Sequence, residues 1–340
     1  RQGTEAIHSE IRGLLDKQVF SGALKSSLSE TQRKKIIRMS CFVRDKRNSD
    51  GSLQKIKARL VAGGHMQDKT VYTMDQTSSP TVATSSVFSI ISTGLSEGRK
   101  FLKFDISMAY LNAKMPDEVF MTLDPDMSDI LCEEAEQLDQ GRDFQKDNSG
   151  RVTVKLEKAL YGCVQSARLW YNHFSSFLKR IGFTPNPYDQ CVFNRVHNGK
   201  QLTLAMHVDD GLATCEDLEQ LQWLDNEIRK EFNDEVESTI NEKVFDYLGI
   251  KIDTSSGVEA ELTMETYILD LCKEHGVYHS SPTPASSNLF KQEEDIEPLD
   301  EPGRVKFHRA VAQLLYLATR VRPDIILPIT YLCSRVSQPT

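Results

Sequence analysis

The sequence predicts an α+β fold. Segments with strand patterns and segments with helix patterns are mixed along the chain, without the regular alternation of a doubly wound parallel sheet. Two turn dipeptides, Asp50-Gly51 and Asn198-Gly199, lie between strand patterns and predict hairpins. The 340 residues, 39% hydrophobic and 26% charged, are enough for two or three subdomains with a sizeable core.

The first half of the chain begins with apolar residues at helical spacing. We expect a helix over residues 7–20, strands over 39–45 and 53–62, and a helix over 85–94. A strand over 101–106 then leads into a helix over 107–113. Lys55, Lys57 and Arg59 recur at period two in the second strand and therefore project from one face, either as a solvated edge or as a binding surface.

The second half continues the mixture of strands and helices. We expect strands over 152–160, 191–196, 201–208 and 212–215, helices over 167–181 and 217–232, a strand pair over 245–252 and 258–263, and helices over 263–275 and 305–318. The apolar stripe of the helix over 167–181, which includes Trp170 and Phe174, is interpreted as core. Residues 124–150 are expected to form a surface excursion of loops or short helices.

Charge is distributed unevenly, although the net charge is −8. Between Lys25 and Arg59 there are eleven basic residues against three acidic ones, and between Asp124 and Asp147 nine acidic against two basic. The local potential of the first stretch could therefore hold phosphates.

Several function classes lack their usual sequence signals. The seven cysteines form no C-x-x-C pair, and the histidines form no H-E-x-x-H, so a zinc hydrolase is not expected. No apolar run approaches 18 residues, and no signal peptide is visible. Because the sequence begins at Arg1, we expect a segment of a longer polypeptide.

Adjacent carboxylates stand in the stretch A-M-H-V-D-D-G-L-A-T, residues 205–214. Asp209 and Asp210 suit an exposed turn, but they also suit Mg²⁺, which binds carboxylates together with substrate phosphates. Asp105, which follows the apolar strand over 101–104, is the candidate third carboxylate, with a helix cap as its alternative role. Carboxylates at the ends of two strands can converge and hold two Mg²⁺ ions for nucleotidyl transfer.

Seven ordered blocks resemble the reverse transcriptase of copia-type (Pseudoviridae) LTR retrotransposons, over almost the whole chain. In the family's consensus they are K-A-R-L-V-A-x-G at residues 57–64, F-D-V-x-x-A-F/Y-L at 104–111, E-V-Y-M at 118–121, L-Y-G-L-K-Q-A-P-R-x-W-Y at 160–171, Y-V-D-D at 207–210, Y-L-G-I-x-I at 247–252 and T-R-P-D-I at 320–325. His207 replaces the family's Tyr, Val164 its Lys and Ala167 its Pro. His65 stands in a block from which a basic residue is missing, and no departure removes a carboxylate.

The resemblance implies a right-hand polymerase whose palm is an antiparallel sheet backed by helices. Fingers would comprise residues 1–79 and 115–164, palm 80–114 and 165–257, and thumb 258–340 with the start of a connection towards an RNase H domain beyond the chain. The implied activity is RNA-directed DNA synthesis, in which dNTPs are added to a primer 3′-hydroxyl. The alternatives are a catalytically inactive polymerase fold that binds nucleic acid, and an α+β domain whose acids are all solvated.

The resemblance also implies roles for individual residues. The implied catalytic residues are Asp105, Asp209 and Asp210, the metal ligands are these three with the Ile106 carbonyl, the dNTP-binding residues are Lys57, Arg59, Tyr110 and Gln165, and the primer grip is Tyr247, Leu248 and Gly249. Tyr110 would exclude the 2′-hydroxyl, and Gln165 would touch the incoming nucleotide or the template.

The implied cofactor is a pair of Mg²⁺ ions, for which Mn²⁺ can substitute. The implied partners are a primed RNA or DNA template, dNTPs, and integrase and RNase H from the same polyprotein, with no membrane. The implied location is a cytoplasmic virus-like particle, or the nucleus.

Overall fold

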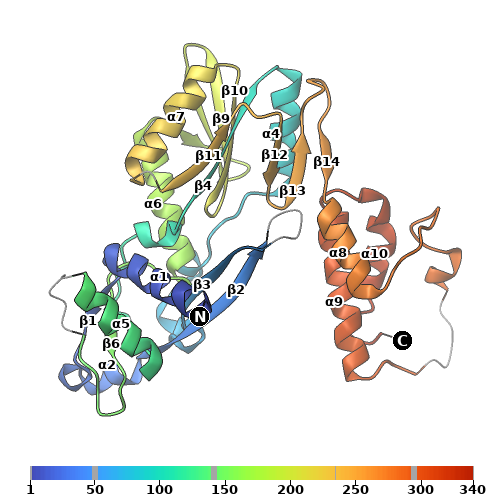
Figure 1. Cartoon of the computed structure of the whole chain (residues 1–340). Coiled ribbons are helices and arrows are strands. Elements are labelled where there is room, and N and C mark those ends of the chain that lie inside the picture. The colour runs from blue at the N-terminus through green and yellow to red at the C-terminus, as the bar shows by residue number, and fades with distance from the viewer. Residues whose placement is uncertain (1, 48–52, 139–143, 234, 292–296, 340) are drawn as a thin grey trace. The chain divides into compact units, whose positions relative to one another are not determined.

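The computed structural model in Figure 1 describes residues 2–47, 53–138, 144–233, 235–291 and 297–339. The chain divides into two compact units, residues 1–90 with 99–241, and residues 91–98 with 242–340. Sheets and helices are mixed along the chain, and all strand pairs but β2–β5 are antiparallel in the described residues. The predicted α+β class is therefore confirmed.

Most elements fall within the first unit. Its strands are β1 (Phe20–Gly22), β2 (Ile37–Arg47), β3 (Leu53–Ala62), β4 (Lys100–Ile106), β5 (Phe120–Thr122), β6 (Thr153–Leu156), β7 (Thr184–Pro185), β8 (Val192–His197), β9 (Lys200–His207), β10 (Asp210–Cys215) and β11 (Val236–Ile240). Its helices are α1 (Gln2–Asp16), α2 (Glu30–Lys34), α3 (Met74–Thr77), α5 (Pro125–Gln137), α6 (Ser166–Arg180) and α7 (Leu218–Glu231), while α4 (Thr84–Ser96) begins in this unit and ends in the second. Short 3₁₀ turns connect several of these elements, among them η4 (Ala109–Asn112) where a longer helix was expected.

A five-stranded sheet in the order β1-β6-β5-β2-β3 carries the first apolar core. Helix α1 packs on β3 because Ile11, Leu14 and Leu15, at helical spacing, form one buried face. The predicted β2–β3 hairpin is present, and its expected Asp50-Gly51 turn lies outside the described residues.

The acidic stretch after residue 124 contains a core helix, so the expected surface excursion is wrong for this part. Helix α5 packs on α1 and buries Leu131 and Ala135. Glu134 is also buried, at 1% exposure, because Arg12 Nε and His8 Nδ1 each lie 2.7 Å from its carboxylate oxygens. The acidic composition of residues 124–150 indicated exposure, but Arg12 and His8 on α1 make the burial of Glu134 favourable.

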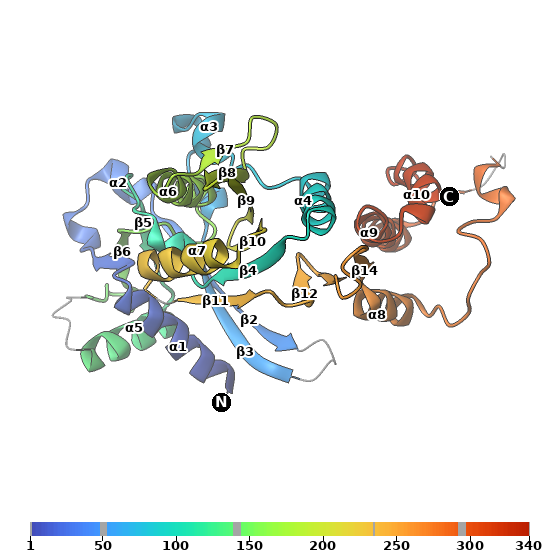
Figure 2. The same ribbon diagram turned by 90° about the horizontal axis from the view of Figure 1, so that it is seen from above.

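A six-stranded sheet in the order β11-β4-β10-β9-β8-β7 carries the second core. Helices α6 and α7 cover one of its faces, as Figure 2 shows from above. Strand β4 shows how the two faces of the sheet differ. Leu102, Phe104 and Ile106 are fully buried on the face that these helices cover. Lys103 and Asp105 alternate with them and therefore lie on the opposite face.

The second unit contains β12 (Val244–Tyr247), β13 (Ile250–Asp253), β14 (Glu261–Thr263), α8 (Glu265–His275), α9 (Glu301–Ala318) and α10 (Ile326–Cys333). The expected single strand over 245–252 is wrong. Leu248 and Gly249 both have positive φ, 52° and 77°, and form a two-residue turn between β12 and β13. No helix in the described part of the chain has the length and hydropathy needed to cross a bilayer.

Candidate active site

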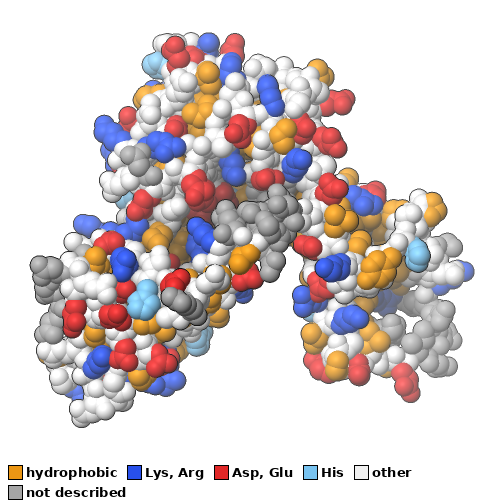
Figure 3. All heavy atoms as spheres, viewed as in Figure 1, with side chains coloured by type: hydrophobic (Ala, Val, Ile, Leu, Met, Phe, Trp, Pro, Cys, Tyr) orange, Lys and Arg blue, Asp and Glu red, His pale blue; other side chains and the backbone are white. Residues whose placement is uncertain are grey.

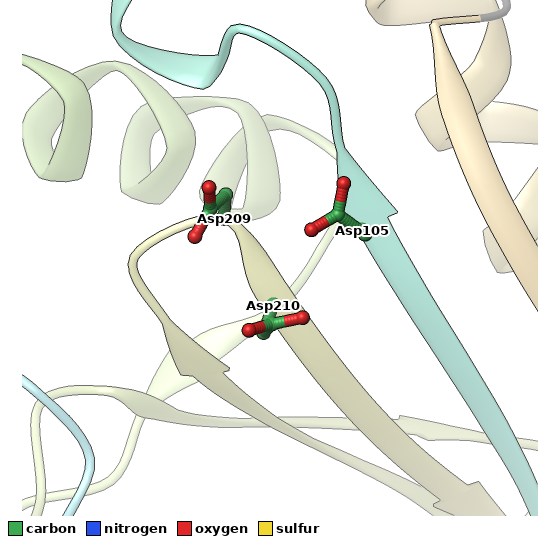
Figure 4. A group of neighbouring side chains, drawn as sticks. All are labelled: Asp105, Asp209 and Asp210. Carbon is green, nitrogen blue, oxygen red and sulfur yellow. The ribbon is translucent and has the colours of Figure 1, made fainter. Parts of the chain in front are cut away.

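Three carboxylates meet at one end of the six-stranded sheet. Asp105 near the end of β4 is the cross-strand partner of Asp210 at the start of β10, and Asp209 precedes Asp210 in the β9–β10 turn. One oxygen from each carboxylate lies within 4.8 Å of the others. Figure 4 shows the three side chains gathered from these two strands. The predicted convergence of Asp105 with Asp209 and Asp210 is therefore present.

Gly211 gives the Phe104 side chain of β4 room to lie against β10. A Cβ atom at this position would stand 2.0 Å from the Phe104 ring, inside any van der Waals contact. Gly211 and Phe104 are cross-strand partners, one residue along from the Asp210–Asp105 pair. A side chain at residue 211 would therefore have to displace the Phe104 ring, directly beside the pair that brings the carboxylates together.

Burial and mutual repulsion make the carboxylates harder to ionise, which raises the pKa values of Asp105 and Asp210. Burial raises the pKa of Asp210 to about 6, with Asp209 and Asp105 adding to the rise and Lys103 and His207 opposing it. Burial and the charge of Asp209 likewise raise the pKa of Asp105. The group therefore carries more negative charge than its surroundings neutralise.

The carboxylates open onto a cavity of about 680 Å³ that basic side chains also line. Lys55, Lys57 and Arg59 reach it from alternate positions of β3, as the period-two pattern predicted. In the space-filling view, acidic and basic side chains lie side by side in the hollow beneath the six-stranded sheet (Figure 3). Such a cavity can receive a polyanion at its basic wall and a cation at its acidic wall.

Two tyrosines stand beside the carboxylates. The rings of Tyr110 and Tyr161 pack against each other with centroids 4.6 Å apart and planes tilted by 34°, and the Arg59 guanidinium lies over the Tyr161 ring at 5.6 Å. The charge of Asp209, after burial, raises the pKa of both phenols. Sequence reasoning named Tyr110 but missed Tyr161, although Tyr161 stands in the quoted L-Y-G block.

Glu237 was also missed. It is the β11 cross-strand partner of Asp105 and lines the same cavity, and its charge adds to the rise in the pKa of Asp105. The available signal was the β-branched content of V-E-S-T-I over 236–240, a segment for which no strand was expected.

Gln165 lies elsewhere in the first unit. Its side chain is 2% exposed, and its amide nitrogen donates to Tyr72 Oη at 3.1 Å and to Asp117 Oδ2 at 3.0 Å, while its oxygen accepts from Gln67 Nε2 at 3.1 Å. It lines a separate cavity of about 470 Å³. Its contact with nucleotide or template stays a prediction.

The expected primer-grip residues belong to the second unit. Tyr247 is buried at 2% exposure, whereas Leu248 and Gly249 form the turn of the β12–β13 hairpin. Tyr316 Oη of α9 donates to the Leu248 carbonyl at 3.4 Å. The backbone of the turn is therefore supported from within its own unit.

A family model described as "Reverse transcriptase (RNA-dependent DNA polymerase)" matches residues 27–285, more than half of the chain. The chain belongs to this reverse transcriptase family. The resemblance drawn from the seven blocks is confirmed, and the family is an enzyme family of RNA-dependent DNA polymerases.

Retrotransposon Pol polyproteins are among the relatives of this chain. It is 26% identical to the Retrovirus-related Pol polyprotein from transposon TNT 1-94 of Nicotiana tabacum, over 82% of the chain and 20% of the relative. It is 28% identical to the polyprotein from transposon RE1 of Arabidopsis thaliana, over 87% and 18%. It is 24% identical to the Transposon Ty1-LR2 Gag-Pol polyprotein of Saccharomyces cerevisiae, over 99% and 18%. The chain thus spans 18–20% of the length of these relatives.

Similar solved structures include a telomerase and a foamy virus protease–reverse transcriptase. An apo telomerase from Candida tropicalis aligns with a TM-score of 0.41 and 8% identity, over 76% of this chain and 59% of that one. The prototype foamy virus protease–reverse transcriptase aligns with a TM-score of 0.38 and 12% identity, over 98% and 37%.

Proposed function

We propose that the chain is an RNA-directed DNA polymerase that adds dNTPs to a primer 3′-hydroxyl at Asp105, Asp209 and Asp210. The observation that carries the proposal is the meeting of these carboxylates within 4.8 Å, in a chain of the reverse transcriptase family. The basic residues of β3, which share the cavity, support it.

The carboxylates fit a hard divalent cation. All three donors are oxygens, the kind that Mg²⁺ and Mn²⁺ prefer, and the raised pKa values of Asp105 and Asp210 indicate charge that a cation would neutralise. We propose that these residues, with the Ile106 carbonyl, hold two such ions. When bound, the ions supply activation of the primer hydroxyl and stabilisation of the leaving pyrophosphate.

The other residues would bind and orient the nucleotide. Lys57 and Arg59 project into the cavity and would hold the triphosphate. Tyr110, packed against Tyr161, would lie under the incoming sugar and exclude a 2′-hydroxyl. Gln165 would touch the nucleotide or the template, and Tyr247, Leu248 and Gly249 would grip the primer.

The subdomains and partners belong to the same proposal. Fingers would comprise residues 1–79 and 115–164, palm 80–114 and 165–257, and thumb 258–340. The partners would be a primed RNA or DNA template and dNTPs, with integrase and RNase H as companions from a polyprotein. A virus-like particle in the cytoplasm, or the nucleus, would be the location.

Primer extension on an RNA template tests the activity. Purified chain with Mg²⁺ or Mn²⁺ should extend a DNA primer, and Asp209→Asn should abolish extension while folding and duplex binding persist. Binding of the hybrid without nucleotide addition by the wild-type chain, under either metal, would instead support a nucleic-acid-binding module. If Asp209→Asn retained DNA synthesis, the proposed catalytic role of the carboxylates would be wrong.

The proposed sugar selection has its own test. Tyr110→Ala should admit ribonucleotides, because the ring that excludes the 2′-hydroxyl is removed, and the preference for dNTP over rNTP should fall by roughly 100-fold. Tyr188→Ala is a matched control because Tyr188 is 98% exposed. Unchanged selection in Tyr110→Ala would remove its proposed role.

A further inference from the structure

The turn between β9 and β10 has an unusual backbone. Val208 is the first residue of this two-residue turn and has a φ of 60°. A β-branched residue rarely adopts this left-handed conformation, which usually persists only where the surroundings hold it in place. Asp209 follows directly, so the position of its carboxylate depends on this turn.

Two hydrogen bonds from different elements hold the turn. Trp170 Nε1 of α6 donates to the Val208 carbonyl at 2.6 Å. The Ile106 backbone N–H of β4 donates to the Asp209 carbonyl at 3.0 Å. Successive carbonyls on the two sides of the Asp209 Cα are therefore both fixed, and one of the bonds depends on a side chain.

The packing around Trp170 does not replace this bond. The indole is 2% exposed and packs against Phe174 and Phe232, with ring centroids 5.6 and 5.5 Å away. A cavity of about 230 Å³ borders both Trp170 and Val208, so the turn has space to shift if the bond is lost. The N–H is the only polar group of the Trp170 indole. A phenylalanine at residue 170 would keep an aromatic ring but could not donate a hydrogen bond.

We propose that Trp170 is a positioning residue for the catalytic turn, whose indole N–H holds the Val208 carbonyl and thereby fixes the Asp209 carboxylate as a cation ligand. The proposal rests on the proposed function for the meaning of a cation at this place. It assigns to Trp170 more than the core role that its helical spacing indicated.

Three single variants separate the hydrogen bond from packing. Trp170→Phe removes the donor, and Phe174→Leu removes aromatic packing in the same cluster while leaving the indole donor in place. Trp223→Phe makes the same chemical change at the second of the chain's two tryptophans, which lies on α7 under the Arg195 guanidinium.

In primer extension by the full chain, we expect Trp170→Phe to lower kcat by roughly 10- to 100-fold, because the bond positions a reacting group. KM for dNTP should stay within about 3-fold, since the basic residues that hold the triphosphate are unchanged. Phe174→Leu and Trp223→Phe should keep kcat within about 3-fold. An equal loss of kcat in Trp170→Phe and Phe174→Leu would overturn the proposal.

Glycine at residue 208 gives a second, stricter test. Glycine adopts a φ of 60° without steric cost, so the turn should keep its shape without the indole bond. In a Val208→Gly background, Trp170→Phe should therefore cost less than about 3-fold in kcat. The same cost in both backgrounds would show that Trp170 does not act through the turn, and would also overturn the proposal.

Mn²⁺ binding, measured by electron paramagnetic resonance, tests the role of Trp170 independently of polymerase activity. Trp170→Phe should weaken Mn²⁺ affinity by roughly 10-fold, and Phe174→Leu should leave it unchanged. If the wild type extends no primer, the proposed polymerase activity fails, and the Mn²⁺ affinities still decide the role of Trp170. Equal affinities in wild type and Trp170→Phe would contradict the positioning role.

Discussion

Buried acids in the first unit differ in what neutralises them. Glu134 on α5 is 1% exposed and receives hydrogen bonds from Arg12 and His8 on α1. Burial acts to raise the pKa of Glu134, yet the combined hydrogen bonds and charges of Arg12 and His8 bring it below its ordinary value. Asp105 and Asp210 are partly buried beside Asp209, and their pKa values are raised.

The difference separates an acid whose ionisation its neighbours favour from acids whose ionisation their neighbours oppose. A carboxylate whose partners lie in the protein stabilises the fold, and loss of a partner is costly. Carboxylates that face one another destabilise the folded chain until a cation joins them. Substitutions should therefore have opposite effects on stability and activity at the two places.

The largest effect should come from Asp105→Asn. It removes a proposed cation ligand, so primer extension should fall at least roughly 1000-fold, about 4 kcal/mol in activation free energy. Because a repelling charge is also lost, the unfolding midpoint without divalent cations should stay unchanged or rise. Rapid-quench extension measures the activity, and thermal unfolding measures the midpoint. A lowered midpoint would contradict the expected relief of charge repulsion.

Glu134→Gln should show the reverse pattern. It weakens the charged hydrogen bonds to Arg12 and His8, so the free energy of unfolding should fall by about 2 kcal/mol. The activity of the folded fraction should be unchanged. Glu133→Gln, the same change at an exposed neighbour, is the control in urea unfolding. Equal stability of these two variants would mean that the contacts of Glu134 contribute nothing.

The smallest effect should be the pH dependence that Asp210 causes. Its pKa of about 6 in the folded chain exceeds the unfolded value of about 3.9. Without divalent cations, the folded state takes up the proton first, so this group's contribution to stability rises as pH falls from about 7 to about 4.

Asp210→Asn should therefore be more stable than wild type at pH 7.5, by about 1 kcal/mol after allowance for solvent screening, and equal to it near pH 4. Urea unfolding in EDTA at both pH values measures this difference. A less stable Asp210→Asn at pH 7.5 would contradict the raised pKa of Asp210. The Glu134 contribution has the opposite sign, because it is present at neutral pH and lost as pH falls below its unfolded pKa of about 4.3.

Local patterns predicted the parts of the fold that local chemistry determines. The strands around Asn198-Gly199 and the helices α6 and α7 lie where turn residues and apolar spacing placed them. Asp105 could be assigned to the same site as Asp209 and Asp210 for two reasons. Asp105 follows an apolar strand pattern and the Asp209–Asp210 pair interrupts one, and both places stand within family blocks. Their cross-strand pairing explains why the interpretation succeeded.

The remaining features depend on contacts between distant residues. Glu134 is buried because Arg12 and His8 lie on another helix, and no pattern within residues 124–150 carries that information. The break at Leu248 places a leucine at positive φ, against its local preference. Gln165 lies in a network with Gln67, Tyr72 and Asp117, which are 48 to 98 residues away in the sequence.

Mn²⁺ binding to the full chain tests whether Asp105, Asp209 and Asp210 hold the cations proposed for nucleotide addition. Electron paramagnetic resonance titration at pH 7.5 would compare wild type, Glu134→Gln and Asp105→Asn. We predict that wild type and Glu134→Gln bind Mn²⁺ with equal affinity and that Asp105→Asn binds at least roughly 10-fold more weakly. Mn²⁺ affinity of Asp105→Asn equal to that of wild type would contradict the account.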